Sequence, residues 1–244
     1  MPRYKAIIEY DGTYFKGFQK QLSAQNTVQE VIENALFKLT LEVVTLVGAG
    51  RTDSGVHAKG QVIHFDLFKP WSSYKLKEGL NFYLEHVCVL CLEDVSEDFH
   101  ARFGAKQRAY EYHILNRKAY PVLENNRVWH VSQELEVEKM QTAADCFIGF
   151  HNFKAFRSAS CQSERFERTL DTLCVKRIND KIITSLKAKS FLHNQVRIIM
   201  GTLVWYALGK ITLQDIQKAL ATGVKEKIGP TAPPYGLYFV HVDF

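Results

Sequence analysis

The sequence predicts an α+β protein of two units, each carrying helices on one face of a mainly antiparallel sheet. Its 244 residues allow one large domain or two of ordinary size, and a hydrophobic share of 46% is enough for a buried core. Strand-like and helix-like runs follow one another in the first half, and the second half repeats this plan without residue-level similarity. The acidic, patternless stretch Glu93–Asp98 separates them, which predicts domains at residues 1–98 and 99–244.

The first half is expected to contain several strands and two helices. Tyr4–Tyr10 alternates between its two faces and ends at the turn Asp11-Gly12, as a strand does. Thr27 begins a helix as a capping box with Glu30, and an apolar stripe at helical spacing follows. The aromatics of 14–19 either contact a ligand or cover a sheet edge. The other expected elements are a β-like run 41–47, a strand 61–67, a helix 72–84 and a buried strand 87–92.

The second half is expected to contain a long hairpin and three helices. The turn Asn179-Asp180 joins the strands 169–178 and 181–189. The stretch 151–168 has no period and is long for a connection, which indicates a functional or mobile loop. The other expected elements are the strands 109–115, 127–131 and 237–242 and the helices 137–147, 191–208 and 212–221.

Composition indicates the compartment of the chain. The N-terminus lacks the pattern of a signal peptide, and the longest apolar run, 198–208, is too short to cross a bilayer. Five cysteines, an odd number, are typical of reduced thiols. The single CxxC spacing, Cys88 and Cys91 in a strand-like run, does not favour a zinc or redox site. We therefore expect a cytoplasmic protein with no metal site.

The formal charge of +5 is too small to establish a nucleic-acid partner on its own. The cations, however, gather in two segments that also contain aromatic residues. This combination suits a polyanion with bases to stack, although solvated surface charge explains any single member equally well. The first segment holds Arg102, Lys106, Arg108, Arg117, Lys118 and Arg127, and the second holds Lys154, Arg157, Arg165 and Arg168.

The stretch Gly48–Ala58 is the candidate active loop. Its three glycines free the backbone for a tight loop, and Arg51 and Asp53 place a cation two residues from a carboxylate. Strand-like runs lead into and out of the loop, and functional residues are often mounted at such positions. An aspartate before Ser-Gly is also a common turn former, and this fragment alone favours that simpler interpretation.

The run Phe191–Leu208 predicts a helix that is apolar nearly all round and ends at Gly209, with Arg197 in its middle. Burying a guanidinium is costly without a carboxylate, so a buried Asp or Glu should face it. Alternatively, Arg197 extends along its stem to water. The proline-rich loop Gly229–Leu237 is rigid and forms either a wall of a site or only a terminal clasp.

Taken in order, these pieces resemble the TruA family of tRNA pseudouridine synthases over the full length of the chain. The nine residues Gly50–Ala58 are the most specific part of the resemblance. The other matching segments are 10–13 with 17–19, 99–103 followed by 108–112, 151–153 through 156–157, 191–197 and 229–237. The family often has Trp where Phe18 stands and Met where Gln195 stands, a departure that affects packing and leaves the chemistry untouched.

The resemblance implies a cofactor-free isomerase that converts uridine to pseudouridine at positions 38, 39 and 40 of the tRNA anticodon stem-loop. It also implies two related ferredoxin-like halves that form a continuous, mainly antiparallel sheet with helices on one face and a central cleft. The partners it implies are tRNA and a second copy of the chain in a homodimer, with no membrane.

The same resemblance assigns roles to individual residues. Asp53 is the carboxylate that stabilises or attacks the ribose centre on which positive charge develops. Tyr110 matches the residue that stacks on uracil and accepts a proton, and Arg197 matches the arginine that pairs with the catalytic carboxylate. Leu237 would form part of the apolar floor under the base, and Arg51 would grip the backbone around a flipped base. The candidate phosphate-binding arm contains Arg157, Arg165 and Arg168.

Two other functions fit the residues without the resemblance. An RNA-binding α+β protein without catalysis would keep the cations and aromatics, but it has no need of an aspartate paired with a helix-buried arginine. A nucleosidase or glycosidase would use a carboxylate, but it normally needs a second acidic residue, and none lies near Asp53 in the sequence.

Overall fold

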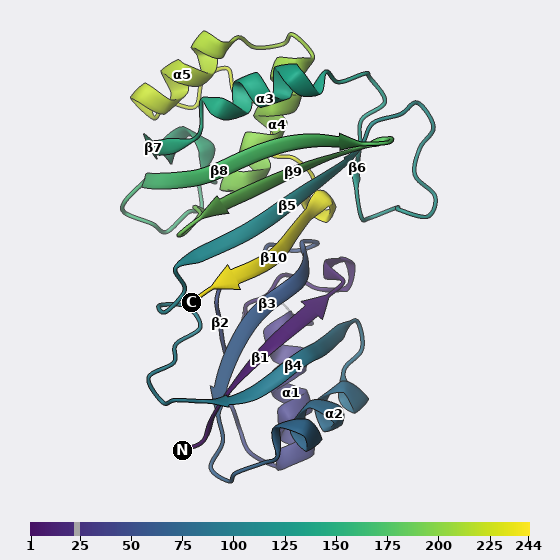
Figure 1. Ribbon diagram of the computed structural model, residues 1–244, viewed down its shortest axis with the longest axis vertical. Helices are drawn as coiled ribbons and strands as arrows, with labels where there is room; N and C mark the ends of the chain where they lie inside the picture. Colours follow the sequence, from purple (N-terminus) through teal and green to yellow (C-terminus); the bar gives the residue numbers. More distant parts are fainter. Residues whose placement is uncertain (22–24) are drawn as a thin grey trace. The chain divides into compact units, whose positions relative to one another are not determined.

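The computed structural model describes residues 1–21 and 25–244, which form two compact units (Figure 1). The first unit comprises Met1–Lys106 with Tyr238–Phe244, and the second comprises Gln107–Leu237. The described part of the chain contains five α-helices and ten strands, paired mostly antiparallel. The α+β class is therefore confirmed, and the domain boundary expected after residue 98 stays a prediction. No helix in the described ranges is long and apolar enough to cross a membrane.

The sheet of the first unit is built around β3 (His57–Asp66). One edge of β3 pairs antiparallel with β1 (Arg3–Tyr10), which pairs in turn with β4 (Val87–Val95). The other edge pairs antiparallel with β2 (Val47–Gly48) and parallel with β10 (Leu237–Asp243). Alternate residues of β1 are fully buried, so the predicted strand faces the core as expected.

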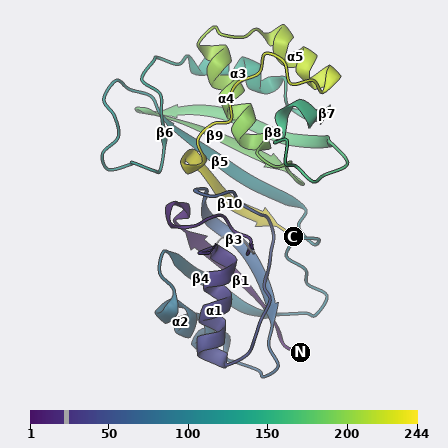
Figure 2. The same ribbon diagram turned by 180° about the vertical axis from the view of Figure 1, so that it is seen from behind.

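The two helices of the first unit, α1 (Val28–Thr40) and α2 (Ser73–Tyr83), cover the same face of this sheet (Figure 2). The capping box predicted for Thr27 and Glu30 is half confirmed, because the side chain of Thr27 caps α1 by accepting the N–H of Glu30. The carboxylate of Glu30 instead accepts the N–H of Asn26, at 2.8 Å. Glu30 therefore ties down the chain that enters α1.

The strand expected over residues 41–47 is wrong for most of its length. Leu41 ends α1 in the left-handed conformation, with φ of 63°, and only Val47 and Gly48 pair with β3. Val44 and Leu46 are buried while Val43 is 86% exposed. The alternation in the sequence therefore reflects burial of a connecting segment against the core, not pairing in a sheet.

The sheet of the second unit has the order β5-β9-β8-β7, with antiparallel neighbours. These strands are β5 (Gln107–Leu115), β7 (Gly149–Asn152), β8 (Glu167–Ile178) and β9 (Lys181–Ala188). The short strand β6 (Trp129–His130) pairs parallel with the end of β5. The predicted hairpin between β8 and β9 is confirmed, and its turn places Asn179 at a φ of 54°.

Three helices lie on one face of the second sheet (Figure 2): α3 (Val137–Asp145), α4 (Gln195–Ala207) and α5 (Leu213–Thr222). The predicted capping box of α5, between Thr212 and Asp215, is confirmed in both directions. The helix expected over 191–208 begins later, because Asn194 is left-handed, with φ of 63°. The side chain of Gln195 accepts the N–H of Leu192, which orders the residues that precede the helix.

Gly201 lets the proline-rich segment lie directly on α4. A Cβ at this position would overlap the carbonyl oxygen of Pro230. Close to this contact, the hydroxyl of Thr202 accepts the N–H of Gly229 at 3.1 Å. Ala232 is bonded to Arg197 twice, by its N–H to the Arg197 carbonyl and by its own carbonyl to the Arg197 side chain. The segment 229–232 is therefore held rigidly along one side of α4.

We predict that Gly201→Ala destabilises the protein by about 1–3 kcal/mol, because the added methyl group meets backbone that cannot move alone. Alanine otherwise stabilises a helix relative to glycine, so the direction of the change is informative. Gly79→Ala in α2 is the matched control, since its methyl group meets only the end of the Leu39 side chain, at 2.7 Å. Urea unfolding of both variants checks this, and equal stabilities would contradict close packing at Gly201.

Candidate active site

The loop that carries Arg51 and Asp53 leaves β2 and returns to β3. Its first residues are held by a side chain of β3, because buried Gln61 donates to the carbonyl of Gly50 at 2.8 Å and accepts its N–H at 3.3 Å. The N–H of Ala49 donates to the carbonyl of Val62 at 2.8 Å. The amide of Gln61 thus takes the place of a neighbouring strand where β2 ends.

The backbone on either side of Asp53 is fixed by buried hydrogen bonds. The hydroxyls of Thr52 and Tyr10 lie 2.7 Å apart, and the carbonyl of Thr52 accepts the N–H of Phe18 at 3.0 Å. Burial raises the pKa of Tyr10, while its hydrogen bonds to Thr52 and Gln61 oppose that shift, so the phenol stays protonated. The N–H of Val56 closes the turn on the carbonyl of Asp53, at 3.1 Å.

The segment between β1 and α1 packs directly against this loop. A Cβ at Gly12 would overlap the carbonyl oxygen of Val56, and the hydroxyl of Ser54 donates to the carbonyl of Phe15 at 3.2 Å. Phe15 and Phe18 are 4% and 3% exposed. Both rings are therefore part of the core, and neither of the two roles expected for this segment is confirmed. Tyr14 is half exposed and stacks on His86, with ring centroids 3.5 Å apart.

Two polar residues of this site were not among the residues predicted from the sequence. His57 is 3% exposed, accepts the N–H of Gly12 at its Nδ1 (3.0 Å) and stacks on Tyr238. Gln61 is fully buried opposite Ile8 in the register of β1 and β3. A polar residue at a core-facing position between apolar neighbours was the available signal for Gln61.

Tyr110 and Arg197 belong to the second unit. Tyr110 lies on β5 opposite Leu186 and is 8% exposed, with its ring edge-to-face with Phe191 at 5.1 Å. Arg197, half-buried in α4, donates from Nε to the carbonyl of Ala232 and from Nη1 to the side chain of Asn194, each at 2.8 Å. The pairing of Arg197 with Asp53 stays a prediction.

Leu237 is the last residue of the second unit and the first residue of β10. Its side chain is 6% exposed. Tyr112 fixes the preceding loop by donating its hydroxyl to the carbonyl of Pro233 at 2.7 Å. The end of the proline-rich loop is therefore held in place, as a wall of a site requires.

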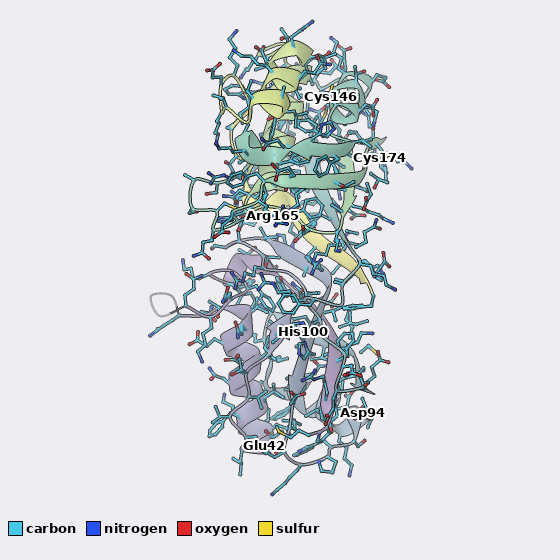
Figure 3. All side chains as sticks on the ribbon, turned by 90° about the vertical axis from the view of Figure 1, so that its left-hand side faces the viewer. Glu42, Asp94, His100, Cys146, Arg165 and Cys174 are labelled. Carbon is cyan, nitrogen blue, oxygen red and sulfur yellow. The ribbon has the colours of Figure 1, made fainter. Side chains whose placement is uncertain are left out.

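Two of the three arginines in the segment 157–168 bind the segment itself. Arg157 donates to the carbonyls of Ser158 and Ala159 and lies over the ring of Phe166, 4.6 Å from its centroid. Arg168 donates to the carbonyls of Arg165 and Glu167 and to the hydroxyl of Ser163. Arg165, labelled in Figure 3, is exposed. Within the described ranges its guanidinium makes no hydrogen bond.

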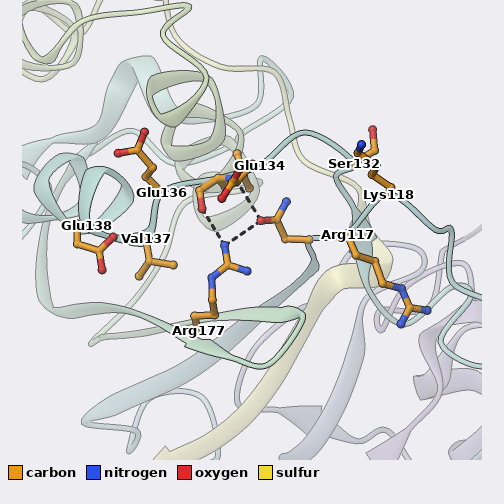
Figure 4. A pocket seen from close by; sticks show the side chains of 10 residues that line it. Arg117, Lys118, Ser132, Glu134, Glu136, Val137, Glu138 and Arg177 are labelled. Carbon is orange, nitrogen blue, oxygen red and sulfur yellow. Dashed lines mark hydrogen bonds between the residues drawn. The ribbon is translucent and has the colours of Figure 1, made fainter.

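A pocket of about 690 Å³ opens in the second unit (Figure 4). It is lined by side chains of both signs, among them Arg117, Lys118, Glu134, Glu136 and Arg177. The guanidinium of Arg177 is bonded to Asn116 and to the carbonyl of Leu135. None of the predicted site residues lines this pocket, so it is not the candidate site. No cluster of three or more His, Cys, Asp or Glu suited to a metal occurs in the described part of the chain.

Comparison with known proteins identifies the family. A family model described as tRNA pseudouridine synthase matches residues 6–104 and 143–244. The chain is 46% identical to tRNA pseudouridine synthase A of Allorhizobium ampelinum over 248 residues, covering 100% of this chain and 95% of that protein. The protein of the same name from Anaplasma marginale strain St. Maries is 46% identical over 246 residues, covering 99% and 100%. The Agrobacterium fabrum protein is 47% identical over 248 residues, covering 100% and 93%. The resemblance seen in the motifs is thereby confirmed, and the chain belongs to the tRNA pseudouridine synthase family.

Proposed function

We propose that this chain is an isomerase that converts uridine to pseudouridine at positions 38, 39 and 40 of the tRNA anticodon stem-loop. The observation that carries the proposal is the Asp53 loop, held by buried hydrogen bonds in a chain of the tRNA pseudouridine synthase family. The choice of the anticodon arm rests on the motifs shared with the TruA family. A binding protein without catalysis would not need so rigid a mount for one carboxylate.

The reaction exchanges one bond to the ribose for another. The bond from ribose carbon 1 to uracil nitrogen 1 breaks, the ring turns, and a bond from the same ribose carbon to uracil carbon 5 forms. Carbon 5 loses a proton and nitrogen 1 gains one, so the reaction consumes no water and no cofactor. Asp53 acts at the ribose carbon, where positive charge develops as the first bond breaks.

The other site residues hold the base and the carboxylate. We assign Tyr110 to stacking on the uracil ring and to accepting the proton from carbon 5, and Leu237 to the apolar floor under the base. Arg197 pairs with Asp53, which would give its guanidinium a third partner besides Ala232 and Asn194. This pairing would resolve the cost of a cation in an apolar helix.

The arginines of 157–168 serve RNA binding in two ways. Arg157 and Arg168 shape the segment through bonds to its own carbonyls, which uses up donors that a phosphate would need. Arg165 is exposed and donates to no described residue, so we assign it to the phosphate backbone. Arg51 grips the backbone around the flipped uridine.

We also propose that the enzyme is a cytoplasmic homodimer. The dimer rests on the family resemblance, and the location rests on the tRNA substrate and on the five free cysteines. Sedimentation equilibrium tests the assembly, and a mass near 28.0 kDa, that of a single chain, would exclude the dimer.

Asp53→Asn is the principal test of the function. We expect tRNA isomerisation to fall below about a hundredth of the parent rate, a barrier increase of about 3 kcal/mol, with tRNA affinity within a few-fold of the parent. Asp98→Asn, at an exposed aspartate of the same unit, makes the same change of charge and should retain full activity. Chemical mapping of pseudouridine in tRNA measures both, and an active Asp53→Asn variant would rule out the assigned role.

The same variant tests the pairing of Asp53 with Arg197. Removing Arg197 alone leaves a carboxylate in an apolar site, so Arg197→Met should destabilise the protein by about 3 kcal/mol or more. Combining it with Asp53→Asn should recover part of that stability and no activity. Strictly additive losses in the free energy of unfolding would show that the two residues are uncoupled.

Tyr110→Phe removes one hydroxyl and keeps the ring that packs on Phe191. We expect normal stability and tRNA binding, with the reaction stalled after the glycosidic bond breaks or before product leaves. Single-turnover assays on substrate labelled at carbon 5 would follow loss of the label. A parent-like rate would reduce Tyr110 to a stacking residue.

Arg165→Gln should weaken tRNA binding and lower the slope of log affinity against log salt by about one, without changing stability. Arg168→Gln should instead lower the protection of the segment from proteolysis, because it removes three bonds within the segment. Filter binding at several salt concentrations and limited proteolysis separate the two effects. Equal salt slopes for Arg165→Gln and the parent would remove Arg165 from the RNA interface.

A further inference from the structure

The segment after β4 is anchored to β3 by a histidine that the proposed chemistry does not use. His64 is 5% exposed, and its Nδ1 accepts the N–H of Ala101 at 3.2 Å. Burial, together with the charges of His100 and Arg3, lowers the pKa of His64 to about 4, and the charge of Asp66 opposes this shift. The ring is therefore neutral at physiological pH and keeps its lone pair for Ala101.

A second histidine fixes the direction of the next residues. Nδ1 of His100 accepts the N–H groups of Arg102 and Phe103, at 3.2 and 3.1 Å, and its ring packs on Phe103 with centroids 4.4 Å apart. The carbonyl of His100 accepts the N–H of Gly104 at 2.8 Å. The backbone N–H groups of this turn are therefore hydrogen-bonded. The side chain of Arg102, which the turn carries, is exposed to solvent.

Arg51 lies in the loop that leads from β2 to β3. Val47 of β2 pairs with His64, the residue that binds Ala101, and Arg51 follows Val47 by four residues, so its loop begins beside the point that anchors the turn of Arg102. Among residues 1–21 and 25–244 the guanidinium of Arg51 makes no hydrogen bond or ion pair. Partial desolvation lowers the pKa of Arg51, and the charge of Arg102 lowers it further, so the two cations lie close enough to repel each other.

We propose that Arg51 and Arg102 together bind one phosphodiester group of the substrate RNA. This proposal rests on the proposed function and deepens it, because it makes Arg102 a substrate-binding residue. Guanidinium groups match the two free oxygens of a phosphate, and an anion between them turns their repulsion into attraction. Since Arg51 is two residues from Asp53 on a rigid loop, a phosphate held there fixes the register of the RNA on the catalytic carboxylate.

Arg102→Gln tests the proposal, with Lys69→Gln as the matched control because Lys69 is an exposed cation of the same unit. We expect Arg102→Gln to weaken tRNA binding several-fold at physiological salt and to lower the salt slope by less than one, because Arg51 still faces the shared phosphate, and Lys69→Gln to change neither. Arg51→Gln and the double variant complete a cycle. If both arginines hold one phosphate, the double variant should lose less affinity than the sum of the single losses.

Variants of His100 give an independent measure of the role of Arg102 in tRNA binding. His100→Ala removes the acceptor that orders Arg102 and keeps the charge, so we expect weaker tRNA binding, and His100→Asn should restore part of it through its side-chain oxygen. Arg102→Lys should keep most of the salt slope and lose affinity. The ammonium group keeps the charge but cannot donate two parallel hydrogen bonds to one phosphate, as a guanidinium can.

Three results would overturn the proposal: Arg102→Gln binding like Lys69→Gln, additive losses in the cycle, or parent-like binding by His100→Ala. Each assumes that the parent protein isomerises tRNA. A parent that bound no tRNA and formed no pseudouridine would overturn the proposed function instead, so the two failures are distinguishable.

Discussion

The hydrogen bonds between the side chain of Gln61 and both backbone groups of Gly50 are the interaction on which the candidate site depends. The neighbouring core-facing positions of β3 are Ile63 and Phe65, so an apolar residue at position 61 would pack well. It would also leave the polar groups of Gly50 without partners, at about 1–3 kcal/mol each. The strand gives up apolar contact at this point to hold the loop that carries Arg51 and Asp53.

The same device recurs wherever the chain must be irregular and rigid at once. Backbone groups outside helices and strands need partners, and in this protein polar side chains supply them. His100 caps the turn that precedes Phe103, and the buried side chain of Asn116 bonds the carbonyls of Val131 and Gln133 and the N–H of Leu135. Asn and His suit this task because they have few rotamers to lose, whereas Gln61 loses more side-chain freedom on burial.

Local patterns predicted most of the fold, because the capping box of Thr212, the turn at Asn179 and the stripe of α1 depend on neighbours in sequence. They failed at Leu41–Leu46, whose alternation arises from tertiary packing of an unpaired segment. The motif 50–58 located the candidate loop. Its supports could not be found in the same way, since the partners of Gln61 and His57 lie 11 and 45 residues away.

Arginines that look equivalent in the sequence differ in how many of their guanidinium N–H donors are already bonded within the protein. Arg3 is bonded to Asp66 and to the carbonyls of Glu97 and Phe99, and Arg168 is bonded within its own segment. An arginine has five N–H donors, so groups committed to carbonyls and carboxylates have fewer left for RNA. Arg51 and Arg165 commit none to the described residues. A count of basic residues overstates the RNA-binding surface, and because phosphate contacts set the salt dependence, the slope should follow the uncommitted arginines and not the formal charge of +5.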